Sequence, residues 1–183
     1  MGAASAAGWD AVELLVAGED VESALLAEVS TLGYPPRVVG VFRRREVPGT
    51  RDVALALWHA SDPGNVGTLI RSADAFGAAV MLSEGCADPF GPKALRAGMG
   101  ATFRVPLLDF ELRNAVALVA DGGEPLGDLG RYGTIVVGSE REGLPDEVLE
   151  QSDARMTIPV RNVESLNVAM AGTIALYERT RGV

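Results

Sequence analysis

The chain has 183 residues, of which 48% are hydrophobic and 22% are charged, and its formal net charge is −9. This composition is typical of a folded globular protein and excludes the low apolar content of disordered chains. The acidic balance argues against nucleic-acid binding through bulk charge, because each phosphate contact needs a local cation. Two basic clusters remain as local candidates, residues 43–45 with Arg51, and Lys93 with Arg96 and Arg104. Taken alone, each cluster is better explained by a solvated face.

Neither a secretory signal nor a membrane span is predicted. The N-terminus lacks a basic segment followed by an apolar run, and no stretch approaches the roughly 20 apolar residues of a membrane helix. We therefore expect a cytoplasmic protein with no membrane partner. The single cysteine, Cys86, is expected to pack rather than react. His59 has no second His or Cys at metal-ligand spacing, so we expect no metal and a strand-end histidine that makes a hydrogen bond.

Residues 1–49 have a short pattern of their own. Residues 20–32 predict a helix ended by Gly33 and Pro35, and residues 37–42 predict a strand. Because this is too little to form an independent core, we expect an N-terminal extension followed by one main domain, residues 50–183.

From Arg51 onward, apolar runs alternate with helical segments, which predicts an α/β domain with a mainly parallel sheet and helices on both faces. The expected strands are 53–58, 79–83, 103–107, 115–120, 134–137 and 155–159. The expected helices are 65–76, 145–151 and 161–178. The segment between Leu108 and Ala115 is too short for a crossover helix of about ten residues. Either that helix is lost or the flanking strands connect differently.

Polar loops containing glycine follow three of the expected strands, at residues 61–65, at residues 138–143 and after Ile158. Ligands bind beyond the carboxyl ends of parallel strands, so the three loops are expected to converge on one cleft. The sequence contains no GxGxxG after the first strand and no GxxxxGK[ST], which disfavours dinucleotide and nucleoside-triphosphate sites. It also contains no GxSxG, which disfavours a Ser-His-Asp hydrolase.

The loops belong to three longer segments, DPGNVGTLIRSADAFG at 62–77, VVGSEREGL at 136–144 and IPVRNVESLNVAMAGTIALYE at 158–178. In order and spacing these segments resemble the motifs of the SpoU branch of the SPOUT RNA methyltransferases. The resemblance implies a C-terminal deep trefoil knot that binds S-adenosylmethionine, and a homodimer formed through the knotted domain. It also implies methylation of a ribose 2′-hydroxyl of transfer or ribosomal RNA. Residues 1–49 would then be an extension or the remnant of an RNA-binding domain.

The resemblance assigns catalytic roles to Arg71, Asn65, Glu140, Ser165 and Asn167. Arg71 matches the arginine usually assigned to activating the hydroxyl. An arginine pKa above about 12 makes a poor general base, so we expect Arg71 to hold the target phosphate or stabilise the developing alkoxide unless its site forces deprotonation. Without the motif, a solvent-facing arginine in an ion pair with Asp74 or a neighbour would be the favoured explanation of Arg71.

The other four residues have both a catalytic and a structural explanation. Asn65 is expected to bond the ribose or orient Arg71, and it can also cap its helix. Glu140 is expected to orient an arginine or Asn167, with a solvated loop carboxylate as the alternative. Ser165 is expected to be the N-cap of the last helix, and Asn167 in its first turn is expected to present its amide to the cleft.

Five residues are expected to hold the cofactor through their backbone groups: Leu82, Gly138, Ile158, Val160 and Leu166. Adenine edges pair well with N–H and C=O groups inside an apolar slot, and glycine permits a close backbone approach.

The chain also departs from the family pattern. Gly98 stands where the family often has serine, Asn162 stands near a family glycine, and the loop before Ser165 is slightly short. A non-catalytic RNA-binding or ribosome-assembly protein that kept the knotted fold is the alternative function. The five catalytic residues together disfavour it. A small-molecule α/β enzyme is disfavoured by the missing phosphate motifs.

Overall fold

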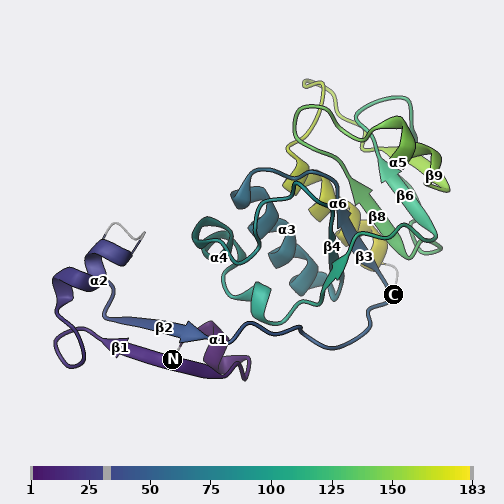
Figure 1. The fold of residues 1–183 in the computed structure, drawn as a ribbon. Coiled ribbons are helices and arrows are strands. Elements are labelled where there is room, and N and C mark those ends of the chain that lie inside the picture. The colour runs from purple at the N-terminus through teal and green to yellow at the C-terminus, as the bar shows by residue number, and fades with distance from the viewer. Residues whose placement is uncertain (1, 31–33, 182–183) are drawn as a thin grey trace. The chain divides into compact units, whose positions relative to one another are not determined.

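The computed structural model describes residues 2–30 and 34–181. The chain divides into two compact units, Met1–Glu46 and Val47–Val183 (Figure 1). None of the described helices is long and apolar enough to cross a membrane.

The smaller unit contains a two-stranded antiparallel sheet of β1 (Ala11–Val16) and β2 (Val38–Phe42). Two helices accompany it, α1 (Ala3–Ala6) and α2 (Ser23–Val29). The predicted strand at 37–42 is confirmed, whereas β1 was not predicted. The helix expected at 20–32 begins later, at Ser23, and the expected positions 31–33 lie outside the described residues.

Arg45, from the first basic cluster, makes its contacts inside this smaller unit. The Arg45 guanidinium lies 5.7 Å from the centre of the Trp9 ring and donates a hydrogen bond to the Ala7 carbonyl at 3.2 Å. Trp9 itself is buried.

The larger unit is built on a seven-stranded sheet in the order β5-β4-β3-β8-β6-β9-β7, and every neighbouring pair is parallel. This confirms the predicted α/β fold. The strands are β3 (Ala54–Leu57), β4 (Ala79–Leu82), β5 (Leu107–Asp109), β6 (Ala115–Leu118), β7 (Glu124–Pro125), β8 (Thr134–Val137) and β9 (Ala154–Thr157).

Helices cover both faces of this sheet, as predicted. They are α3 (Pro63–Phe76), α4 (Pro92–Gly98), the 3-10 turn η1 (Ala101–Phe103), α5 (Asp146–Glu150) and α6 (Val168–Thr180). Leu55 and Leu57 point into the large core beneath α3 and α6, whereas Ala56 between them belongs to a smaller cluster with Val148 of α5. This alternation follows from the two-residue period of a strand.

Small residues let α6 and α4 pack closely against α3, and Figure 1 shows the three helices grouped together. A Cβ added to Gly172 of α6 would lie 2.5 Å from Leu69 Cδ2. A Cβ added to Gly67 of α3 would overlap the Ala94 carbonyl oxygen of α4. Gly172 of α6 and Gly67 of α3 are therefore required for the close packing of these helices.

The connection from β5 to β6 resolves the question of the missing crossover helix. Residues 110–114 contain no helix, and the two strands are not neighbours, since β4, β3 and β8 lie between them. At about 4.8 Å per strand the crossing covers about 19 Å, which five residues span only in an extended form. Phe110 packs edge-on against Trp58 during the crossing, with ring centres 5.3 Å apart.

Two predicted elements were placed wrongly. Residues 103–107 do not form one strand, because η1 ends at Phe103 and β5 begins only at Leu107. The last helix begins at Val168 rather than at 161, and its N-cap is Asn167 rather than Ser165. The Asn167 Oδ1 accepts hydrogen bonds from the backbone N–H groups of Ala169 and Met170, which explains where the helix starts.

After β9 the chain returns along residues 158–167 toward α6, which packs against α3 and β8. The knot concerns how this return threads through the preceding loops, and it stays a prediction.

Candidate functional site

A cleft of about 420 Å³ opens beyond the carboxyl ends of β6, β8 and β9. Its walls come from residues 118–120 at the end of β6, from the end of β8 and the loop after it, and from the segment between β9 and α6 with the first turns of α6. Parallel strands place these three chain segments at one edge of the sheet, which is where ligands bind in such folds.

Seven predicted site residues line this cleft: Gly138, Glu140, Ile158, Val160, Ser165, Leu166 and Asn167. Asn65 does not line it but is hydrogen bonded to Glu140 and Asn167. Arg71 and Leu82 are neither in the lining nor joined to it by such bonds. The structure thus brings most of the predicted residues together, and their roles stay predictions.

The loop after β8 requires glycine at position 138. A Cβ added there would overlap the Gly143 carbonyl group and lie 2.7 Å from the Leu144 nitrogen. The loop is closed by two backbone hydrogen bonds between Ser139 and Gly143, of 3.0 and 3.2 Å, which hold Glu140 and Arg141 at its turn. Gly138 therefore permits the tight loop that presents these two side chains.

A chain of side-chain amides joins the three motif segments. Because Asn167 uses its Oδ1 to cap α6, its Nδ2 is the end directed to Asn65, where it donates to Oδ1 at 3.1 Å. The Nδ2 of Asn65 is then left to donate to Glu140 Oε1 at 2.9 Å. The helix cap thereby fixes the orientation of both amides, and a carboxylate acceptor ends the chain.

Glu140 is held as a carboxylate at this position. Burial is the largest single influence and raises the pKa of Glu140. The hydrogen bonds from the Asn65 side chain and from backbone N–H groups, among them that of Asp62 at 3.4 Å, together hold this pKa below its ordinary value. A carboxylate held by donors in this way accepts protons poorly and orients its partners well.

Asp62 and Lys93 stabilise the start of α3, a role that was not predicted for either residue. Asp62, rather than Asn65, is the N-cap of α3, and its Oδ1 accepts from the N–H groups of Gly64 and Asn65 at 2.7 and 3.0 Å. Its Oδ2 pairs with Lys93 Nζ at 2.7 Å, a hydrogen bond that lowers the pKa of Asp62. Aspartate directly before Pro63 is a helix-start pattern that the sequence already contained.

Arg71 lies on the exposed side of α3, six residues beyond Asn65, a rise of about 9 Å along the helix axis. The ion pair with Asp74 that would explain it structurally is not formed. Asp74 instead accepts hydrogen bonds from Arg104, through Nε at 3.2 Å and Nη2 at 2.5 Å. Arg71 is therefore exposed and has no hydrogen-bond or ion-pair partner among the described residues, and its catalytic role stays a prediction.

Leu82 ends β4, which β3 separates from β8, and it packs against the large core. It therefore lies apart from the other four predicted cofactor residues.

His59 and Cys86 lie together at the carboxyl ends of β3 and β4. His59 has a left-handed backbone with φ of 49°, stacks on Trp58 at 4.6 Å between ring centres, and donates its backbone N–H to Ser83 Oγ at 2.9 Å. Cys86 is half-buried, and its thiol donates to the Leu57 carbonyl at 3.3 Å. Within residues 2–30 and 34–181, no group of three or more His, Cys, Asp or Glu side chains can hold a metal ion.

Comparison with known proteins identifies the family. The SpoU rRNA Methylase family matches residues 52–177. The chain is 37% identical over 131 residues to the 23S rRNA (guanosine(2553)-2'-O)-methyltransferase RlmP of Bacillus subtilis, covering 63% of this chain and 53% of that protein.

Two solved structures are similar over nearly the whole chain. The SpoU methyltransferase AviRb from Streptomyces viridochromogenes, in complex with the cofactor AdoMet, gives a TM-score of 0.85 at 25% identity, covering 100% of this chain and 88% of that chain. The AdoMet-bound rRNA methyltransferase from Sinorhizobium meliloti gives a TM-score of 0.84 at 26% identity, covering 98% and 83%.

The chain therefore belongs to the SpoU rRNA methylase family, as its three motifs predicted. It spans about half the length of RlmP, 53%, and 66% of a Synechocystis relative called a tRNA/rRNA methyltransferase.

Proposed function

We propose that the protein transfers a methyl group from S-adenosylmethionine to a ribose 2′-hydroxyl of ribosomal or transfer RNA. The observation that carries this proposal is the amide chain from Asn167 through Asn65 to Glu140, which ties the three motif segments together at one cleft. Family membership and the cofactor named in two similar structures support it independently.

The cleft residues fit the proposed cofactor. A volume of about 420 Å³ falls within the usual range for small-molecule sites, about 300–1,000 Å³. Its walls combine apolar side chains, such as Ile158, Val160 and Leu166, with the backbone of the tight loop after Gly138. These backbone groups would hold the adenine edge. When bound, S-adenosylmethionine supplies a methyl group on a sulfonium centre.

The chemistry needs three tasks from the protein. The 2′-oxygen must lie in line with the methyl carbon, its proton must leave, and the charge that develops on it must be stabilised. Asn65 and Asn167 are amides fixed in orientation, so they suit the positioning task. Arg71 is a cation on the exposed side of α3 and suits the stabilising task, or it holds the adjacent phosphate. Ser165 lines the cleft and can bond the nucleotide.

An arginine variant tests this function. Arg71→Ala should leave S-adenosylmethionine binding unchanged in calorimetry, because Arg71 does not line the cleft. Incorporation of tritiated methyl into total RNA should fall about a hundredfold, as when one stabilising donor is removed from an active site. Arg113→Ala, at an exposed arginine paired with Glu111, is the matched control. Wild-type protein that binds the cofactor but transfers no methyl would instead favour the non-catalytic RNA-binding alternative.

RNA binding in this acidic protein must be local. Two residues of the second basic cluster, Lys93 and Arg104, are paired with Asp62 and Asp74, so they contribute less cationic surface than the sequence suggested. The proposal therefore places the main RNA contacts around Arg71 and the mouth of the cleft. RNA as the substrate also favours a cytoplasmic location.

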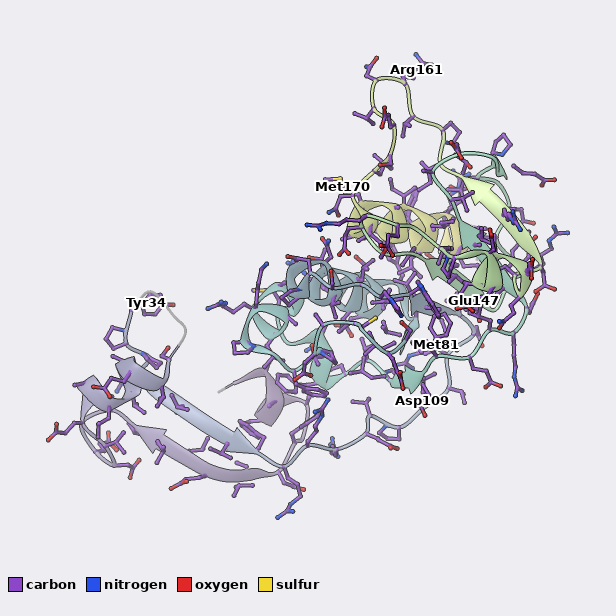
Figure 2. All side chains as sticks on the ribbon, turned by 45° about the horizontal axis from the view of Figure 1, so that its top comes forward. Tyr34, Met81, Asp109, Glu147, Arg161 and Met170 are labelled. Atoms are coloured by element: carbon purple, nitrogen blue, oxygen red, sulfur yellow. The ribbon has the colours of Figure 1, made fainter. Side chains whose placement is uncertain are left out.

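A homodimer is part of the proposal, formed by a second copy against the exposed side of α6. Met170, Ile174 and Tyr177 follow one another at helical spacing with 61%, 38% and 53% of their surface exposed, and Figure 2 shows Met170 near the start of the helix. Such a stripe on a helix predicts a packing partner. Light scattering should give twice the chain mass for wild type and one chain mass for Ile174→Glu, with Val163→Glu on the exposed loop as control.

A further inference from the structure

The cleft contains three charged residues among those that line it: Glu140, Arg141 and Glu164. They lie on two different walls. Glu140 and Arg141 belong to the tight loop after β8, and Glu164 belongs to the segment that precedes α6. Two carboxylates and one guanidinium give the lining a net charge of −1.

S-adenosylmethionine carries the opposite set of charges. It has two cationic centres, the sulfonium and the ammonium, and one anionic centre, the carboxylate of its amino-acid end. The lining thus offers one charge of the right sign for each charge of the ligand. In a mainly apolar cleft, a few matched charges of this kind fix the orientation of the ligand.

The three lining charges differ in how they are engaged. Glu140 is bonded to Asn65 and to the Asp62 backbone, so its position is fixed. In the described part of the chain, the side chains of Arg141 and Glu164 form no hydrogen bond or ion pair with other residues. These two are therefore available to a ligand, one from each wall.

We propose that Arg141 binds the carboxylate of the amino-acid end of S-adenosylmethionine and that Glu164 binds its ammonium group. This inference rests on the proposed function and adds a site for the part of the cofactor that the backbone contacts to adenine leave unassigned. Arginine suits the role because its planar guanidinium forms two parallel hydrogen bonds with a carboxylate. An RNA phosphate is the competing ligand for Arg141, but it would leave the carboxylate of a bound cofactor without a cation in the lining.

Two thioethers that differ only at this end provide the test. S-adenosylhomocysteine retains the amino-acid end, whereas 5′-deoxy-5′-methylthioadenosine lacks it, and neither carries a sulfonium charge. Calorimetric titration of the full chain with both ligands would compare wild type, Arg141→Gln and Glu164→Gln. Arg161→Gln is the control, because Arg161 lies at the tip of the projecting loop before α6 and does not line the cleft (Figure 2).

Arg141→Gln should weaken S-adenosylhomocysteine binding about five- to tenfold and methylthioadenosine binding by less than about twofold. Glu164→Gln should show the same selectivity with a smaller loss, and Arg161→Gln should change neither ligand. Equal losses for both ligands, or no loss for S-adenosylhomocysteine, would overturn the proposal. An unchanged affinity for both ligands with weaker RNA binding would assign Arg141 to an RNA phosphate instead. Wild-type protein that binds neither ligand would reject the proposed function itself.

Discussion

The two walls of the cleft are built differently. On one side, which we call the tied wall, Glu140 and Asn167 line the cleft and are bonded to Asn65, and Asp62, which bonds Glu140 through its backbone, caps α3 behind this lining, with hydrogen bonds of 2.7 to 3.4 Å throughout. On the other side, residues 159–166 are largely exposed and contain no helix or strand. The tied wall is organised before any ligand arrives, whereas the other wall can adjust to a ligand.

This difference agrees with the separate demands of binding and catalysis. Groups that position reacting atoms must be held within a fraction of an ångström, which a bonded network achieves. A segment that covers a cofactor must let it enter and leave, and segments with few buried contacts open most readily. Changes that loosen the tied wall should therefore cost stability and activity, whereas residues 159–166, the open wall, should tolerate substitution.

The largest effect is expected from Gly138→Ala. The added Cβ would overlap the Gly143 carbonyl group, so the loop that presents Glu140 must move. We expect a loss of about 1–3 kcal/mol in the free energy of unfolding and at least about a tenfold loss of cofactor affinity. Urea unfolding and calorimetry measure the two effects.

Gly133→Ala is the matched control, because Gly133 directly precedes the same strand and has open space around its Cβ position. Equal losses for both variants would show that the effect comes from β8 itself and not from the shape of the loop.

The second largest effect on stability and activity is expected from Asn65→Asp. This substitution keeps the shape of the side chain and removes the hydrogen-bond donor to Glu140. The new carboxylate would face the Glu140 carboxylate without a proton between them. Because both groups are partly exposed, the expected loss in unfolding free energy is about 1 kcal/mol, with about a tenfold loss of methyl transfer. Asn162→Asp, on the open wall, should leave both measurements unchanged. A similar loss there would contradict the distinction between the walls.

The sequence allowed the sheet to be predicted well because its strands are short apolar runs between turn residues, and Thr134–Val137 was predicted with its observed limits. The site was predictable where residues lie in the motif loops.

The assignment of the helix N-caps was wrong. Ser165 and Asn65 were both chosen as cap residues by type, whereas Asn167 and Asp62 form the bonds. Several polar residues stood at each helix start, and only the backbone path decides which side chain reaches the free N–H groups.

Contacts between segments distant in the sequence could not be predicted from local sequence patterns either. The β5 to β6 crossing depends on which edge of the sheet each strand joins, and no local pattern specifies that order. The position of Leu82, on a strand that β3 separates from β8, depends on the same strand order. The partner of Asp74 is Arg104, thirty residues away, rather than Arg71 on the same helix.

A smaller effect is expected in the pH dependence of the free energy of unfolding, to which the Glu140 carboxylate of the tied wall contributes. The pKa of Glu140 is lower in the folded protein than its ordinary value of 4.5, so its contribution to stability is fully present above that value. The contribution is lost as the pH falls through the lowered folded pKa. Glu140→Gln should therefore flatten the loss of stability below about pH 4.5, measured by urea unfolding at a series of pH values. Glu164→Gln, on the open wall, should leave the wild-type slope in place.

The smallest effect on stability is expected from the buried hydroxyl of Thr102 in η1. Thr102 is fully buried, and its Oγ1 has no hydrogen-bond partner among residues 2–30 and 34–181. A Cβ added to Gly98, where the family often has serine, would lie 3.2 Å from that oxygen, so a serine hydroxyl can reach it. Thr102→Val should be neutral or stabilising by about 1 kcal/mol, because it removes an unpaired polar group.

Gly98→Ser should then stabilise the wild-type protein by about 0.5–1 kcal/mol more than it stabilises the Thr102→Val variant, since only the former has a hydroxyl to pair with. Urea unfolding of the four proteins gives this coupling directly. Additive effects that are destabilising in both backgrounds would mean that the two hydroxyls do not bond and that the added side chain crowds its neighbours, of which the Thr102 side chain at 3.2 Å from the Cβ position is the nearest. In that case Gly98 is required for the close packing of α4 on α3, and the departure from the family pattern is structural.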